Sequence, residues 1–203
     1  MIFNFTHNYQ FTTRVSMDGV NLQVVNDSKL LGTHITDDLK WDLNPKQLVK
    51  KGNSRMQLLR KISSFGGSIE DMKHIYIVFI RSILETSSSV WHKSLTKENE
   101  NNLERIQKTA FRLILGSRYT SYENAQSLLC LSTLKDRREI LFTKFTLKSL
   151  KLQQMNTLFR NKYKEHPMET RTEIDKYKVD MANTERLRMS AGIQMQITAN
   201  KYK

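Results

Sequence analysis

The spacing of apolar residues changes at Asn44, and this change constrains the fold more than any other feature of the 203-residue chain. Before it, runs rich in Thr, Val and Phe flank Asp18-Gly19, a pair typical of two-residue β-hairpin turns. We predict strands over 10–17, 20–25 and 29–35. After it, apolar residues recur every three or four positions, which is the helical period. The sequence therefore predicts a mainly α fold with a small N-terminal antiparallel β meander.

Capping residues divide the part after residue 43 into successive helices. Asn44 is expected to be the N-cap of the first helix, with Pro45 at its first position. Later helices are expected to be capped by Ser68, Thr96, Ser121 and Ser132. The expected helices cover 44–62, 69–87, 96–115, 121–129 and 132–152.

The expected inner faces of the three longest amphipathic helices are apolar. The first is expected to bury Leu48, Met56, Leu59 and Ile62; the next Leu103, Ile106, Ala110, Leu113 and Ile114; the last Leu134, Ile140, Leu141, Phe145 and Leu147. We therefore predict a helical domain over 44–152. It follows a β segment over 1–43 and precedes a basic, partly ordered C-terminal arm over 153–203.

The balance of charge indicates the class of partner. The chain holds 33 basic and 20 acidic residues, a net charge of +13, although its first 45 residues hold three basic and five acidic side chains. Such a field favours polyanions, nucleic acid first and an acidic membrane face second. The longest apolar run, over 75–80, is far shorter than the ~20 residues that a spanning helix needs, so no membrane-spanning helix is expected. Of the two polyanions we expect nucleic acid as the partner and no membrane. The alternative is a basic surface without a particular partner.

Two helix faces gather the candidate nucleic-acid-binding residues, opposite or beside the expected apolar faces. They are Lys46, Lys50, Arg60 and Lys61 on the first helix, and Arg105, Lys108 and Arg112 on a later one. Three cations along ~10 Å of helix can follow a few phosphates of a nucleic-acid backbone. The alternative is a solvated face with pairs such as Glu104–Lys108.

Sequence patterns for catalysis are missing. There is no Gly-rich phosphate loop and no Gly-x-Ser-x-Gly elbow. Asp37-Asp38 lacks the third carboxylate that two-metal chemistry requires, which favours turn and helix-start charges. Cys130 is the one cysteine, which excludes a multi-cysteine zinc site. We expect no catalytic residue, no metal ligand and no cofactor held by this chain.

Six segments stand in the order in which one protein family carries similar strings. They cover 29–41, 51–60, 80–91, 103–112, 134–138 and 183–190. They resemble, in turn, LGxxIDxxLxW, KANSRLGFLRR, VRSVLEYGSVVW, LEKVQRRAARF, LxxRR and TERxRNS. These strings belong to the reverse transcriptases of jockey-type non-LTR retrotransposons, the RNA-directed DNA polymerases of these transposable elements.

The resemblance implies a role for each part of the chain. Residues 1–43 would be the end of a palm domain with a primer-grip-like hairpin at Leu31 and Gly32, and 44–152 would be a thumb-like bundle. The catalytic aspartates and their Mg²⁺ would belong to a palm portion upstream of Met1, so the chain is expected to be catalytically silent. Its basic helices would hold the backbone of an RNA or DNA template–primer duplex.

The sequence also supports expectations about self-association, an alternative function and location. N-terminal strands without their palm partners would leave open edges and favour self-association. The alternative function is a helical protein-interaction module without a nucleic-acid partner, marked by an apolar groove on the 69–87 helix. An intracellular location, nuclear or cytoplasmic, fits the single cysteine, and the sequence does not choose between them.

Overall fold

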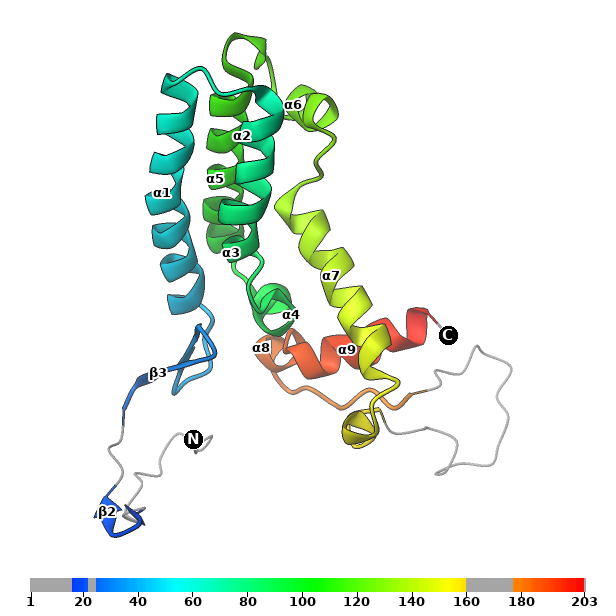
Figure 1. The fold of residues 1–203 in the computed structure, drawn as a ribbon. Helices are drawn as coiled ribbons and strands as arrows, with labels where there is room; N and C mark the ends of the chain where they lie inside the picture. The colour runs from blue at the N-terminus through cyan, green and yellow to red at the C-terminus, as the bar shows by residue number, and fades with distance from the viewer. Residues whose placement is uncertain (1–15, 22–24, 160–176, 203) are drawn as a thin grey trace.

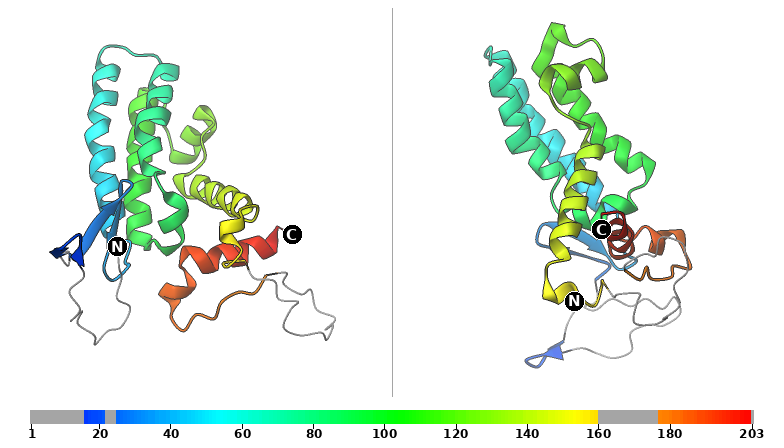
Figure 2. Two further views of the ribbon diagram at one scale, coloured as in Figure 1. Left: turned by 60° about the horizontal axis from the view of Figure 1, so that its bottom comes forward. Right: turned by 90° about the vertical axis from the view of Figure 1, so that its right-hand side faces the viewer.

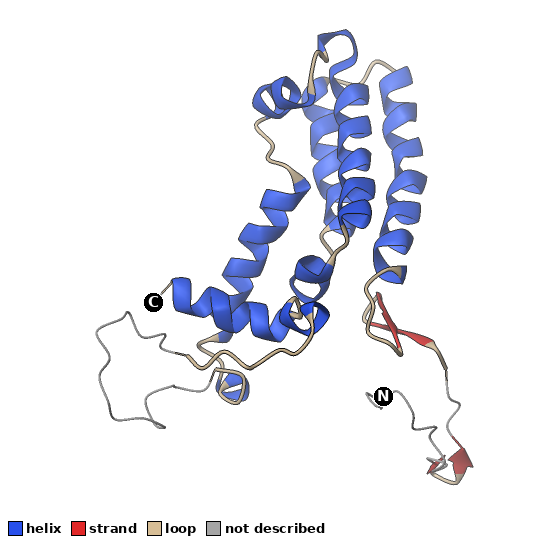
Figure 3. Ribbon diagram, turned by 180° about the vertical axis from the view of Figure 1, so that it is seen from behind, coloured by secondary structure: helices blue, strands red, loops and turns tan. Residues whose placement is uncertain are grey.

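The computed structural model describes residues 16–21, 25–159 and 177–202 (Figure 1). These parts are mainly helical, with two short β-hairpins near the N-terminus, which confirms the predicted fold class (Figure 3). In Figure 1 the chain rises along α1, descends through α2 and α3, rises along α5 and descends along α7. The C-terminal helices lie across the lower end of α7, as both views of Figure 2 show.

The first hairpin joins β1 (Ser16–Met17) to β2 (Val20–Asn21). Its turn residues Asp18 and Gly19 both have positive φ, 50° and 78°, which is the geometry of a tight mirror-image hairpin turn. The predicted turn is confirmed. Residues 10–15 and 22–24 of the predicted strands lie outside the described residues.

The second hairpin joins β3 (Asp27–Leu30) to β4 (Thr33–Thr36), so the prediction of one strand over 29–35 is wrong. Leu31 and Gly32 form its turn with φ of 47° and 85°. Glycine adopts such a conformation without steric cost, and this is why the apolar run folds back at Gly32. Within the described residues the two hairpins form separate two-stranded sheets.

Three long helices frame the helical part: α1 (Leu43–Ser64), α5 (Lys97–Leu115) and α7 (Leu134–Ser149). Between α1 and α5 lie α2 (Ile69–Ile75), the π-helix η1 (Tyr76–Arg81), α3 (Ser82–Leu84), α4 (Ser88–Trp91) and the 3₁₀ helix η2 (His92–Ser94). The others are η3 (Gly116–Arg118), α6 (Tyr122–Leu129), η4 (Gln153–Met155), α8 (Glu185–Arg188) and α9 (Ala191–Lys201).

Three of the predicted N-caps are confirmed. The side chains of Ser68, Thr96 and Ser121 each accept the backbone N–H three residues further on, at 3.1–3.2 Å. Each such bond satisfies one of the N–H groups that a helix start leaves without an intrahelical partner.

Two predicted N-caps are wrong. α1 begins at Leu43, and Asn44 is buried with its Oδ1 accepting the backbone N–H of His34 at 3.2 Å. Asn44 therefore ties the second hairpin to α1 instead of starting the helix. α7 is capped by Thr133 and not by Ser132, whose carbonyl oxygen accepts a hydrogen bond from α5.

The main core lies between α1, the continuous α2–η1–α3 stretch and α5. The predicted inner faces of α1 and α5 are confirmed, with Ile62 and Leu113 only partly buried. In the middle stretch, Tyr76, Ile80 and Leu84 lie four residues apart and all are fully buried. The i→i+5 bonding of a π-helix widens the turn, which keeps residues at this spacing on one line.

The predicted inner face of α7 is wrong. Leu134 is buried as expected, but Ile140 and Phe145 are 46 % and 43 % exposed. The buried line is instead Leu134, Arg138, Phe142, Thr146 and Ser149. This line faces α4, η2 and α9, so tertiary packing rather than apolar spacing sets which face is buried.

The C-terminal part packs against this buried line of α7. Phe142, Phe159, Met195 and Ala199 form a second apolar cluster. The hydroxyl of Ser94 donates to the carbonyl oxygen of Met189 at 2.8 Å, which fixes the segment before α9 to η2. Residues 160–176 of the predicted arm lie outside the described residues.

Candidate nucleic-acid interface

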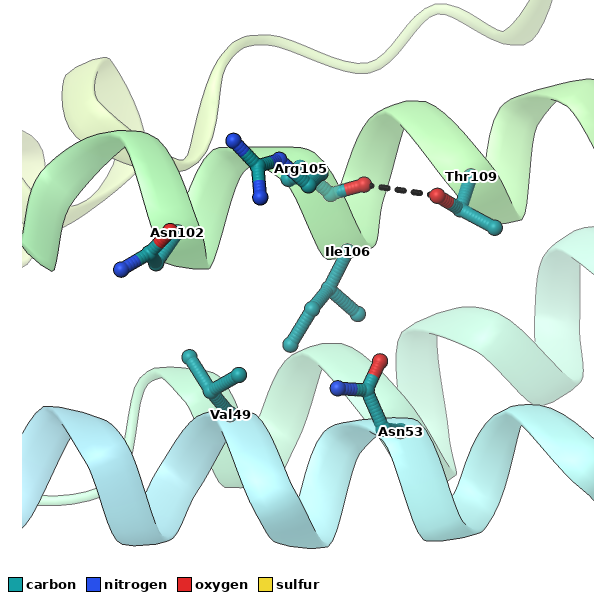
Figure 4. Close-up of a pocket in the computed structure, with 6 residues that line it drawn as sticks. All are labelled: Val49, Asn53, Asn102, Arg105, Ile106 and Thr109. Atoms are coloured by element: carbon teal, nitrogen blue, oxygen red, sulfur yellow. Dashed lines mark hydrogen bonds between the residues drawn. The ribbon is translucent and has the colours of Figure 1, made fainter. Parts of the chain in front are cut away.

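α1 and α5 lie side by side and run in the same direction (Figure 4). Gly52 lies in their interface: a Cβ atom there would be 2.9 Å from Cδ1 of Ile106 and 3.1 Å from Cδ2 of Leu84. A larger residue at this position would therefore require the ends of the Ile106 and Leu84 side chains to shift. Because Gly52 has no side chain, α1 and α5, the two helices that carry the candidate cations, can pack directly against each other.

A groove with a volume of about 140 Å³ separates α1 from α5 on one side of this contact (Figure 4). It is lined by Val49 and Asn53 from α1 and by Asn102, Arg105, Ile106 and Thr109 from α5. The Thr109 hydroxyl donates to the backbone oxygen of Arg105 at 2.9 Å. Within the described residues, the amides of Asn53 and Asn102 make no hydrogen bond, so they are free to meet a ligand.

Residues seven apart lie close to one line along a helix, because seven residues are nearly two turns. Lys46, Asn53 and Arg60 share such a line on α1, and Asn53 lines the groove. Arg105 and Arg112 share one on α5. Of the seven predicted cations, Arg105 itself lines the groove. Helical spacing continues its line to Arg112 and the line of Asn53 to Lys46 and Arg60, over ~10 Å of α5 and ~21 Å of α1. We call these four cations the rim of the groove.

The other three predicted cations are not brought to the groove. Lys50 and Lys61 are exposed further round α1, away from its buried line. The Lys108 ammonium lies over the Tyr122 ring, 5.0 Å from its centroid, beside α6. The Arg112 guanidinium also meets an aromatic ring, that of Tyr119 at 5.3 Å, at the C-terminal end of the rim.

All seven predicted cations are exposed, namely Lys46, Lys50, Arg60, Lys61, Arg105, Lys108 and Arg112. None of them forms an ion pair with another residue in the described parts of the chain. Their charge is consequently available to an external anion.

The alternative pair Glu104–Lys108 does not form. Oε1 of Glu104 accepts the hydroxyl of Tyr122 and, at 3.1 Å, the backbone N–H of Leu134. Burial and this hydrogen bond to Glu104 raise the pKa of Tyr122 well above its usual range. Glu104 therefore joins α5 to α6 and α7 and does not pair with Lys108.

The predicted primer-grip-like residues lie at the tip of the second hairpin. The Leu31 side chain is 91 % exposed, and Gly32 follows it in the turn. The hairpin packs on the first turns of α1, the end of the helix that carries Lys46. Its tip therefore presents an apolar side chain to solvent.

Asp37 and Asp38 form a local turn. Asp38 accepts the hydroxyl of Thr36 at 2.7 Å and the ammonium of Lys40 at 2.7 Å. The hydrogen bonds from Lys40 and Thr36 hold the pKa of Asp38 well below its usual range. Across the described residues, no group of three or more His, Cys, Asp or Glu side chains is placed to hold a metal ion.

Residues of the family-like segments meet inside the protein. Arg137 from the fifth segment bonds Glu85 from the third at 3.0 Å, and Arg81 lies 3.7 Å from the same carboxylate. The guanidinium of Arg138 lies 5.9 Å from the ring centroid of Trp91. These segments thus supply a polar centre that joins α3, α4 and α7.

Arg138 is fully buried, and two of its guanidinium nitrogens, Nη1 and Nη2, have no hydrogen-bond partner among the described residues. Its Nε donates to Nδ1 of His92 at 3.4 Å, a long bond. Burial lowers the pKa of Arg138, while the nearby Glu104, Glu100 and Glu85 oppose this shift. His92 continues the cluster outward to Glu139, which also pairs with Lys93.

The sequence reasoning did not find the three uncharged polar groove residues Asn53, Asn102 and Thr109. A signal was present, since Asn53 lies seven residues from both Lys46 and Arg60, and Asn102 lies seven from Thr109. Residue spacing within one helix does not show which other helix lies beside it. The sequence therefore could not show that the line of Asn53 on α1 lies beside the line of Asn102 and Thr109 on α5.

Comparisons with protein-family models, with curated proteins and with solved structures give no match. No helix of the described residues is both long enough and apolar enough to span a membrane.

Proposed function

We propose that this chain binds the sugar–phosphate backbone of a nucleic-acid duplex, without sequence preference, through the α1–α5 groove. The observation that supports this function best is the exposed, unpaired Arg105 in the groove. Helical spacing places Lys46, Arg60 and Arg112, which are also exposed and without an ion pair, on the same helix lines as the groove residues. Following the resemblance in the sequence, the duplex would be the template–primer duplex of a reverse transcriptase. Catalysis would then require carboxylates outside this chain. The chain alone would not catalyse polymerisation.

The dimensions of the rim fit a duplex. Each strand of B-DNA carries one phosphate per ~3.4 Å of its axis, so the ~21 Å between Lys46 and Arg60 spans about six phosphates. Cations spaced along parallel helices neutralise phosphates without reading bases. The free amides of Asn53 and Asn102 add neutral donors for phosphate or sugar oxygens between the charged ends.

The test is fluorescence anisotropy with a labelled 20-base-pair duplex at two salt concentrations. Arg105→Gln combined with Arg112→Gln removes two rim charges. We expect about tenfold weaker binding and a salt dependence reduced by about two phosphate contacts, since each such contact contributes about one unit of slope. Lys144→Gln with Lys148→Gln on α7 removes the same charge elsewhere and is the matched control.

Two results would contradict the proposal. One is the absence of duplex binding by the wild-type chain at low salt. The other is an equal loss of affinity in the rim variant and the α7 control, which would indicate attraction to net charge instead of to the groove.

One observation favours the second candidate function, a protein-interaction module. Val78 and Phe79 on η1 are 45 % and 47 % exposed, and Leu58 on the adjoining face of α1 is 42 % exposed. Arg55 of α1 donates to the carbonyl oxygen of Phe79 at 2.8 Å, which places these residues side by side. A protein that remains bound in stoichiometric amount after nuclease treatment, and is lost on Phe79→Ser, would support this function over the first.

A further inference from the structure

The outer face of α7 carries a second group of unpaired cations. Lys144, Lys148 and Lys151 are exposed, and none forms an ion pair with any described residue. The backbone N–H of Lys151 donates to the carbonyl oxygen of Lys148 at 3.1 Å, so the helical turn continues past Ser149. Residues 140–152 contain these three lysines and no acidic residue. The lysines, spaced four and three residues apart, therefore follow one another along one side of the helix.

Exposed apolar side chains lie near these lysines. Ile140, Phe145 and Leu152 are 46 %, 43 % and 45 % exposed. Ile140 precedes Lys144 by one helical turn, and Phe145 precedes Lys148 by three residues, so each of these apolar groups neighbours a lysine on the helix surface. The opposite face of α7 is already packed against α4 and α9.

We propose that the outer face of α7 binds single-stranded nucleic acid, with phosphates on Lys144, Lys148 and Lys151 and a base stacked on Phe145. An aromatic ring offers stacking only to unpaired bases, and basic grooves with stacking rings bind single strands without sequence preference. A duplex keeps its bases paired and offers none to the ring, so this face favours single strands. This surface is distinct from the duplex groove, because α5 lies between α1 and α7 (Figure 1).

The mixture of charged and apolar groups on one face of α7 favours a nucleic-acid strand over a lipid surface. A helix that lies on a bilayer separates its charged groups from an apolar face that enters the acyl region. On α7 the exposed Phe145 and Ile140 lie within one helical turn of a lysine and form no separate apolar face. A single strand offers both phosphates for the lysines and unpaired bases for the Phe145 ring.

The test measures anisotropy of a fluorescein-labelled oligothymidylate of 20 nucleotides and of the 20-base-pair duplex with the full chain. Lys144→Gln, Lys148→Gln and Lys151→Gln together should weaken oligothymidylate binding at least tenfold. They should also lower its salt slope by about two units, at about 0.7 per phosphate on single strands. Phe145→Ala, an exposed substitution, should weaken the same binding at least fivefold. Duplex affinity should change less than twofold in both variants.

A second readout separates stacking from charge. Phe145→Trp should show fluorescence quenching on addition of oligothymidylate and none on addition of duplex, because stacking needs an open base. The rim variant Arg105→Gln/Arg112→Gln should lose duplex and keep oligothymidylate binding. If instead duplex binding proves absent in all chains while the α7 variants still lose the single strand, the duplex function fails and the α7 proposal stands.

Three outcomes would overturn the α7 proposal. The first is unchanged oligothymidylate affinity in the triple-lysine variant, and the second is an equal loss for the duplex. The third is binding to vesicles containing 30 mol % phosphatidylserine that the triple variant abolishes while oligothymidylate binding stays the same, which would assign the face to a membrane.

Discussion

α5 and α7 are neighbouring helices of 19 and 16 residues, yet they are held in the protein by different kinds of contact. α5 buries a continuous apolar face, including Leu103, Ala110 and Ile114. α7 buries Arg138, Thr146 and Ser149 and leaves Ile140 and Phe145 half exposed. Apolar spacing therefore identifies the buried face only where the neighbouring surface is itself apolar. Where the neighbour supplies polar atoms, a polar line can be buried.

The largest expected change in stability comes from a substitution in the buried apolar face of α5. Leu103→Ala removes a fully buried side chain from α5 and should lower the free energy of unfolding by about 3 kcal/mol. Ile140→Ala on α7 should change it by less than about 0.5 kcal/mol, because Ile140 is largely solvated. Urea unfolding followed by circular dichroism measures both. Similar losses in the two variants would mean that α7 does bury Ile140.

The next effect concerns Gln107, a buried polar residue near the centre of α5. Gln107 is fully buried; it accepts the Tyr76 hydroxyl at 2.5 Å and donates to Ser132 and Tyr122. Gln107→Leu should cost about 2 kcal/mol, since it leaves buried polar groups without partners. The same denaturation assay applies, with exposed Gln57→Leu as the matched control. A cost no greater than that of the control would show that this network adds no stability.

A smaller effect is expected at the polar core of α7. Arg138 has two guanidinium nitrogens without partners, so its desolvation is poorly offset. Arg138→Met fills a similar volume without charge and should leave the free energy of unfolding within about 1 kcal/mol or raise it. Arg138→Ala, which opens a cavity beside Trp91, should be clearly worse than the methionine variant. Equal losses in both variants would show that the charge itself stabilises α7.

The smallest effect is a pH dependence at the outer edge of the same cluster. Burial lowers the pKa of His92, although Glu139 opposes the shift, while Arg138 and Lys93 support it. The unfolded chain therefore binds a proton at this residue more readily than the folded chain. Stability from His92 is present above its unfolded pKa of about 6.5 and declines as the pH falls through and below that value.

The measurement is the urea midpoint at pH 7.5 and pH 5.5. The decline should be smaller in His92→Gln, which cannot be protonated. A steeper decline in that variant would mean that protonated His92 is stabilised by Glu139. The carboxylate of Glu139 acts at lower pH: burial opposes its ionisation, but hydrogen bonds from Lys93 and His92 outweigh burial and lower its pKa.

Local signals in the sequence predicted the helical class, the Asp18-Gly19 turn and the caps at Ser68, Thr96 and Ser121, because each depends on residues within three positions. The inner faces of α1 and α5 were also predictable, since both face an apolar core.

The failures share a different cause. Asn44 was expected to cap α1, but it bonds the hairpin ten residues earlier. The buried line of α7 depends on α9, which lies more than forty residues further along the chain. In the candidate interface, all the predicted cations are exposed. Which of them lie near the groove depends on the packing of α1 parallel to α5, and the sequence did not predict this packing.

The π-helix η1 sets the rotational phase between the two ends of one continuous helix. A π-helical turn takes up one residue more than an α-helical turn, so the segment after η1 carries an extra residue without being turned away from its neighbours. Leu84, at the end of this stretch, lies against Gly52 of α1, and the next residue, Glu85, bonds Arg137 of α7. Two adjacent residues thus join one continuous helix to two different partners.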